Sequence, residues 1–102
     1  MKFIIKNPKQ NFVMLARRIG YMPMPSTEQE FNCVRPVAGN RYPRFHLFIT
    51  ENKQANELIF NLHLDQKKQS YQGSSAHSGE YNGQVIEIEM QRIKEVIKKL
   101  VA

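Results

Sequence analysis

Polar side chains able to do chemistry are concentrated in residues 60–81, at the predicted end of a strand and in the segment after it. His63 and Asp65 are two residues apart, so in an extended strand both side chains point to the same face. His77 and Glu80 follow in a stretch rich in Gly and Ser, which we expect to be a loop that folds back over the strand. The sequence therefore places a candidate site at this strand end.

Imidazole and carboxylate groups are ligands that zinc and other divalent transition metals accept. The candidate metal ligands, which include one further histidine, are His46, His63, Asp65, His77 and Glu80. No HExxH or comparable short motif fixes two of them on one element, so the site would depend on the loop returning to the strand. Isolated histidines on strands more often form structural hydrogen bonds or face water, so metal binding is the alternative interpretation.

The same region also contains the residue types of a hydrolytic site. The candidate nucleophiles, bases and orienting acid are Ser74, Ser75, Ser78, His77, His63 and Asp65. The nucleophile elbow GxSxG is absent, and no element of the predicted fold holds a serine beside its base. We therefore assign no catalytic residue, and a non-enzymatic function is favoured.

Basic and aromatic residues are interleaved in two places. Such interleaving suits single-stranded nucleic acid, because basic residues contact the phosphate backbone and aromatic residues stack on the bases. The candidate contact residues are Arg41, Tyr42, Arg44 and Phe48 near one strand, with Lys67, Lys68 and Tyr71 in the loop. In the alternative interpretation, Tyr42 and Tyr71 cover the edge of the core and the cations are merely solvated.

The excess of positive over negative charge lies entirely in the first half of the chain. The net charge is +6, from 15 Lys and Arg against 9 Asp and Glu; residues 1–50 contribute 8 − 2 = +6 and residues 51–102 contribute 7 − 7 = 0. This asymmetry favours a surface that faces a polyanion such as RNA or DNA. Residues 73–79 lack the GxxxxGK[ST] pattern, so the Gly-rich segment is not a nucleotide-binding loop of that kind.

Length and composition predict one globular domain spanning residues 1–102. The chain is 41% hydrophobic and 24% charged, and no apolar run approaches the roughly 20 residues needed to span a bilayer. The N-terminus reads as a strand rather than a secretory signal, so we expect a cytoplasmic protein without membrane contact. Cys33, the only cysteine, excludes an internal disulfide and is expected to be a buried thiol.

The first half predicts a strand, a helix and a second strand. Residues 1–6 alternate as a strand, Asn7 is the expected N-cap before Pro8, and the helix should run to about Ile19. The prolines in residues 21–27 argue against regular structure there, and a second strand is expected over residues 28–35.

Residues 44–50 and 58–65 alternate cleanly and predict a hairpin. The expected core face is Phe45, Leu47, Ile49, Leu58, Phe60, Leu62 and Leu64, and the opposite face carries Arg44, His46, Phe48, Ile59, Asn61, His63 and Asp65. Pairing Thr50 with Glu57 would set His46 opposite Asn61, with His46 and His63 as diagonal neighbours roughly 7 Å apart.

The last segment predicts a loop over residues 66–83 and a helix starting near Gln84, with an apolar stripe through Met90, Ile93 and Ile97. The fold class is thus α+β, a two-layer β-α-β-β-β-α arrangement in which both helices cover one face of an antiparallel sheet. Without its first strand, this order resembles the double-stranded-RNA-binding fold. Such domains have a basic start to the last helix, whereas residues 84–89 are acidic here.

Three segments carry a resemblance at the level of sequence: YPRFH at residues 42–46, FNLHLDQKK at residues 60–68, and AHSGEY at residues 76–81. They resemble a family of small uncharacterised proteins from uncultivated bacteria. The resemblance implies one compact domain with a shared loop, and it brings no established activity.

The sequence therefore favours a small binding domain whose ligand is RNA, DNA or another polyanion. The expected contact surface combines the basic first half, the uncovered sheet face and the loop. Two alternatives stay open: a site for zinc or another divalent transition metal, and a surface for a protein partner or a homodimer.

Overall fold

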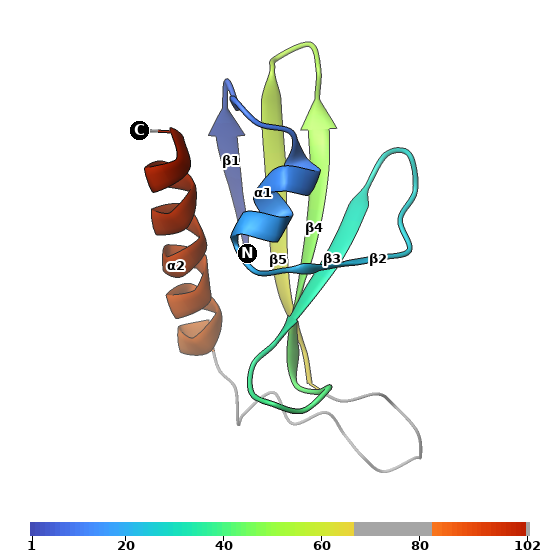
Figure 1. Ribbon diagram of the computed structural model, residues 1–102, viewed down its shortest axis with the longest axis vertical. Helices are drawn as coiled ribbons and strands as arrows, with labels where there is room; N and C mark the ends of the chain where they lie inside the picture. The colour runs from blue at the N-terminus through green and yellow to red at the C-terminus, as the bar shows by residue number, and fades with distance from the viewer. Residues whose placement is uncertain (67–82, 102) are drawn as a thin grey trace.

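One antiparallel sheet and two helices make up the computed structural model, which describes residues 1–66 and 83–101 (Figure 1). The elements are β1 (Lys2–Lys6), α1 (Phe12–Arg18), β2 (Met22–Met24), β3 (Phe31–Pro36), β4 (Arg44–Asn52), β5 (Glu57–Asp65) and α2 (Gly83–Val101). This is the predicted α+β class, with one strand more than expected. Neither described helix has the length and apolar character that crossing a bilayer requires.

The strands are arranged in the order β1-β5-β4-β3-β2, so the N-terminal strand pairs with the last one. The extra strand, β2, has three residues and lies at the sheet edge against β3. We expected no regular structure there because of the prolines. An edge strand needs only one ladder of hydrogen bonds, so Pro23, which has no N–H to donate, is tolerated.

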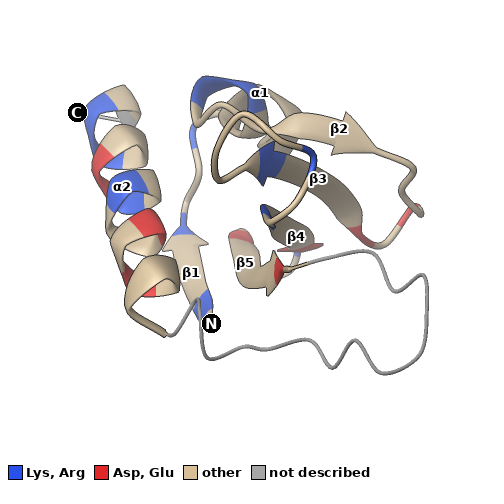
Figure 2. Ribbon diagram, turned by 90° about the horizontal axis from the view of Figure 1, so that it is seen from below, with Lys and Arg blue, Asp and Glu red and all other residues tan. Residues whose placement is uncertain are grey.

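The sheet curls, and both helices lie on its concave side (Figure 2). The core forms between them: Leu15 and Ala16 come from α1, and Met90, Ile93 and Ile97 come from α2. The sheet contributes the predicted alternating residues, among them Phe45, Leu47, Ile49, Leu58, Phe60 and Leu62, each at most 4% exposed. Each fully buried side chain of this size contributes roughly 1.5–3 kcal/mol.

The first helix starts later than its sequence suggested. Asn11 is the N-cap, and its side-chain oxygen accepts a hydrogen bond of 2.9 Å from the backbone N–H of Met14. Asn7 instead adopts a left-handed conformation with φ of 52°, so it turns the chain after β1 and does not cap the helix. The second helix begins at Gly83, one residue before the predicted start near Gln84.

The β4–β5 register differs from the predicted one by two residues. Thr50 pairs with Ile59, and His46 pairs directly with His63 instead of lying diagonal to it. The turn is shorter than expected because Asn52 accepts a hydrogen bond from the backbone N–H of Ala55 and Asn56 takes a left-handed φ of 54°. A shift by two leaves every side chain on its predicted face but changes its neighbours.

Candidate functional site

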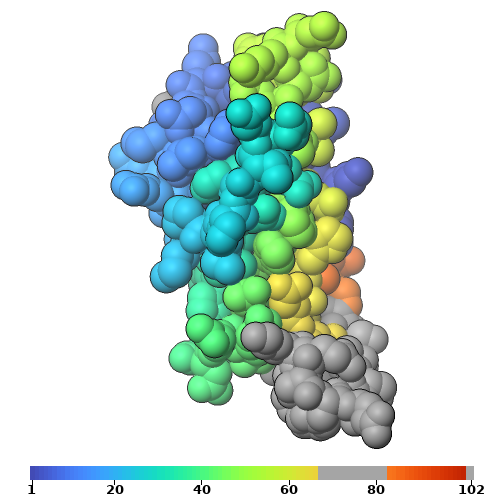
Figure 3. Space-filling model, turned by 90° about the vertical axis from the view of Figure 1, so that its right-hand side faces the viewer, coloured from blue at the N-terminus to red at the C-terminus, as the bar shows by residue number. Residues whose placement is uncertain are grey.

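The convex face of the sheet carries most of those predicted site residues that the structure describes. One row across the strands runs His63–His46–Val34–Met22, and the next runs Lys2–Asn61–Phe48–Asn32–Met24. Figure 3 looks onto this side, where atoms of β4 and β5 (green and yellow) reach the surface and neither helix lies over them. Among the described residues no helix covers this side of the sheet, and we call these two rows, together with Arg44 and Asp65, the open face.

Asp65 holds two neighbours on the open face. Its Oδ2 accepts hydrogen bonds from His46 Nδ1 at 3.0 Å and from Arg44 Nε at 3.3 Å. Because a carboxylate only accepts, the proton of neutral His46 is on Nδ1, and Nε2 carries the lone pair. Nε2 is buried, and it has no hydrogen-bond partner among the residues that the structure describes. Asp65 thus fixes both the orientation and the tautomer of this imidazole.

Phe48, in the neighbouring row, contacts both histidine rings. Its ring stacks on His46 with centroids 4.2 Å apart and meets His63 edge-on at 5.3 Å. Such offset and edge contacts are favoured by the ring quadrupoles. The two imidazoles and the phenyl ring thereby form one continuous aromatic cluster, with His63 exposed and Phe48 half-buried.

A second aromatic contact adjoins this cluster at the start of β4. The Arg44 guanidinium lies over the ring of Tyr42, 4.6 Å from its centroid, and is also paired with Asp65. Arg41 is exposed in the turn before them. The hairpin and this turn thus bring together four of the seven residues predicted to contact nucleic acid.

The surroundings of His63 keep its ring neutral. Burial lowers the pKa of His63 below the usual imidazole range, and the charge of the Met1 amino terminus and the nearby His46 lower it further. Asp65 acts in the opposite direction but does not outweigh them. At neutral pH His63 therefore presents an uncharged ring with both polar and stacking surfaces.

The basic residues of the first half divide between the two sides of the molecule. Lys2 and Arg44 lie on the open face, whereas Arg17 and Arg18 belong to the last turn of α1 and Arg35 pairs with Glu89 under the helices. Figure 2 shows basic residues on α1 and α2 as well as on the sheet. The charge asymmetry of the sequence therefore does not become a single basic patch.

Five predicted site residues lie outside the described residues: Lys67, Lys68, Tyr71, His77 and Glu80. Within residues 1–66 and 83–101, no three His, Cys, Asp or Glu side chains are grouped so that they could hold a metal ion. The predicted ligands that the structure does describe, His46, His63 and Asp65, lie side by side on the open face.

Sequence reasoning missed a buried ionic network under the second helix. Glu89 is 3% exposed and accepts hydrogen bonds from Tyr21, Arg35 and Arg92, while Arg92 also donates to the carbonyl of Ile19. A signal was present, because this acid occurs four residues before Ile93 on the apolar stripe. The network fixes α2 to the end of α1 and to β3, and its carboxylate has no capacity left for a ligand.

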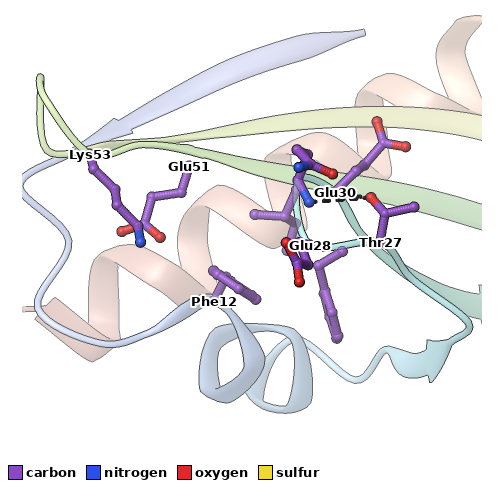
Figure 4. Close-up of a pocket in the computed structure, with 9 residues that line it drawn as sticks. Phe12, Thr27, Glu28, Glu30, Glu51 and Lys53 are labelled. Atoms are coloured by element: carbon purple, nitrogen blue, oxygen red, sulfur yellow. Dashed lines mark hydrogen bonds between the residues drawn. The ribbon is translucent and has the colours of Figure 1, made fainter.

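A pocket of about 370 Å³ lies at the far end of the core, between α1, the β2–β3 turn and the end of β4 (Figure 4). Its lining is Phe12, Thr27, Glu28, Gln29, Glu30, Phe31, Ile49, Glu51 and Lys53. Three carboxylates against one ammonium do not complement an anionic ligand. None of the predicted site residues lines this pocket, so a polyanion is better matched by the open face.

Comparisons of the chain with protein-family models, with curated proteins and with solved structures gave no match.

Proposed function

We propose that this protein is a non-enzymatic domain that binds single-stranded nucleic acid on the open face of its sheet. The observation that carries the proposal is the aromatic cluster of His46, Phe48 and His63 at the centre of a sheet face that neither described helix covers. Unpaired bases stack on rings presented in this way, and each stacked base contributes roughly 1–3 kcal/mol. A duplex keeps its base faces stacked internally, so such a cluster favours a single strand.

Cations flank the cluster where a phosphate backbone would pass. Lys2 lies in the same row of the sheet as Phe48, two strands away and therefore at roughly 10 Å. Arg41 is exposed in the turn before β4, and Arg44, although paired with Asp65, stays partly accessible with 18% of its side chain exposed. Positive charge beside a stacking surface matches the phosphate backbone of a bound strand.

Polar groups between the rings and the cations give the face hydrogen-bonding capacity. Asn61 sits between Lys2 and Phe48 in the register, and the neutral imidazole of His63 offers both a donor and an acceptor. These groups suit contacts to base edges or to sugar hydroxyls. We expect modest sequence preference, because stacking and backbone charge dominate such surfaces.

The proposal is tested by fluorescence anisotropy with a labelled oligodeoxythymidylate of about ten nucleotides, a typical span for one small domain. Phe48→Leu keeps an apolar side chain but removes the stacking ring, so affinity should fall roughly five- to hundredfold. Phe12→Leu, on the helical side, is the matched control and should leave affinity unchanged. Equal affinities of all three proteins, or no binding at low salt, would exclude the open face as the binding surface.

A further inference from the structure

We propose that His46 and His63 form a two-histidine site for a divalent transition-metal ion, with Asp65 positioning His46. This inference is independent of nucleic-acid binding, since it concerns the free protein. It starts from the register: the two histidines are directly opposite on β4 and β5, with both side chains on the open face. Directly opposite residues have Cβ atoms about 4.5–5.5 Å apart, close enough for two imidazoles to share one ion.

The tautomer of His46 suits metal binding through Nε2. Its Nδ1 donates to Asp65 at 3.0 Å, which leaves the lone pair on Nε2, and within residues 1–66 and 83–101 this buried nitrogen has no hydrogen-bond partner. Buried ring nitrogens are ordinarily satisfied, so this one is an exception that a ligand would explain. Metal-binding histidines commonly donate their other N–H to a carboxylate, because that contact fixes the ring and raises its basicity.

The second donor is accessible. His63 is exposed, and among the residues that the structure describes its ring nitrogens have no hydrogen-bond partner. Rotation of this side chain can therefore place a nitrogen beside Nε2 of His46 without breaking a polar contact. The ion enters from solvent on the His63 side, and water completes its coordination.

The local charge decides which ions are bound. Arg44 neutralises Asp65 and the Met1 ammonium adds positive charge near His63, so the surroundings offer no net negative charge to attract a hard cation. Binding then depends on the two imidazole nitrogens, which suit Zn²⁺, Ni²⁺ and Cu²⁺ but not Mg²⁺. Cu²⁺ should bind more tightly than Zn²⁺, as expected for nitrogen ligands.

The test is a calorimetric titration of zinc chloride into the full chain without nucleic acid, with the imidazole signals followed by NMR. We expect one saturable site, with signals of His46 and His63 shifted. His63→Gln should weaken Zn²⁺ binding at least about tenfold, and Asp65→Asn about tenfold with an altered pH dependence of affinity.

Glu51→Gln is the matched control, because it removes an exposed acid at the other end of the strand that carries His46 and should leave the affinity unchanged. The proposal is overturned if no heat and no imidazole shift appear. It is equally overturned if Glu51→Gln weakens binding as much as His63→Gln does, or if Mg²⁺ binds as well as Zn²⁺. His63 is exposed, so loss of binding in its variant cannot be attributed to misfolding if the backbone spectrum is unchanged.

Discussion

The Tyr21 hydroxyl donates a hydrogen bond of 2.6 Å to Glu89 Oε2, joining the start of β2 to the middle of the second helix. The contact is buried, and it keeps the tyrosine protonated: burial, followed by the Glu89 carboxylate, raises the pKa of Tyr21 far above its usual range. The carboxylate also pairs with Arg35 and Arg92. One charged side chain therefore connects three parts of the chain: the residue before β2, strand β3 and helix α2.

Replacement of Glu89 by glutamine should lower the free energy of unfolding by roughly 2–4 kcal/mol, because it leaves Arg35 and Arg92 without their anionic partner. The loss stays below that of a fully buried pair, since the two arginine side chains are 35% and 34% exposed and can reach water. Urea denaturation gives the value. Glu87→Gln, an exposed acid on the same helix, should change stability by no more than about 0.5 kcal/mol. Similar values for both variants would mean that the network does not stabilise the fold.

His63 should make the protein less stable in mild acid. Its pKa is lowered in the folded state, so the unfolded chain takes up the proton first as the pH falls through the ordinary imidazole range of about 6.5. Stability is complete above that range and decreases as the pH falls toward the lower folded pKa. Melting temperatures at several pH values between about 7.5 and about 5.5 should therefore decrease less in His63→Gln than in the natural chain. Identical slopes in the two proteins would show that His63 is not the responsible group.

Cys33 should not react with alkylating reagents in the native protein. It is fully buried against Leu47 on the core face, and burial raises its pKa to about 12. Because the thiolate is the reactive form, alkylation by iodoacetamide at mildly alkaline pH should proceed only as fast as the protein unfolds. Mass spectrometry with and without urea measures this. Rapid labelling of the native protein would place the thiol at the surface and contradict the packing of β3 described above.

The fold was largely predictable because hydrophobic periodicity is a local signal. Alternation in residues 44–50 and 58–65 assigned the core face correctly, and the stripe through Ile93 and Ile97 placed the last helix. The prediction for Asn7 was wrong because an Asn before Pro resembles a cap, whereas the backbone there turns left-handed and the cap is Asn11. The local sequence pattern does not distinguish Asn7 from Asn11 as the N-cap, since the start of the helix depends on how β1 pairs with the rest of the sheet.

The site was less predictable because neighbours across a sheet depend on register. The observed β4–β5 turn is two residues shorter than the predicted one. His46 therefore pairs with His63 and not with Asn61, and Asp65 lies within hydrogen-bond distance of His46 and Arg44. Their shared face, by contrast, followed from alternation alone. Residue types and faces were thus available from sequence, and the contacts that give them a chemical role were not.

The central claim is that the open face binds single-stranded nucleic acid, and the most direct measurement is an NMR titration of the labelled protein with an oligodeoxythymidylate of about ten nucleotides. We predict saturable shifts of backbone amides around Phe48, Asn61 and His63, with α1 unaffected, and an affinity that falls steeply as salt rises from about 50 to about 200 mM. Shifts confined to the helices, or no shifts at low salt, would contradict the account.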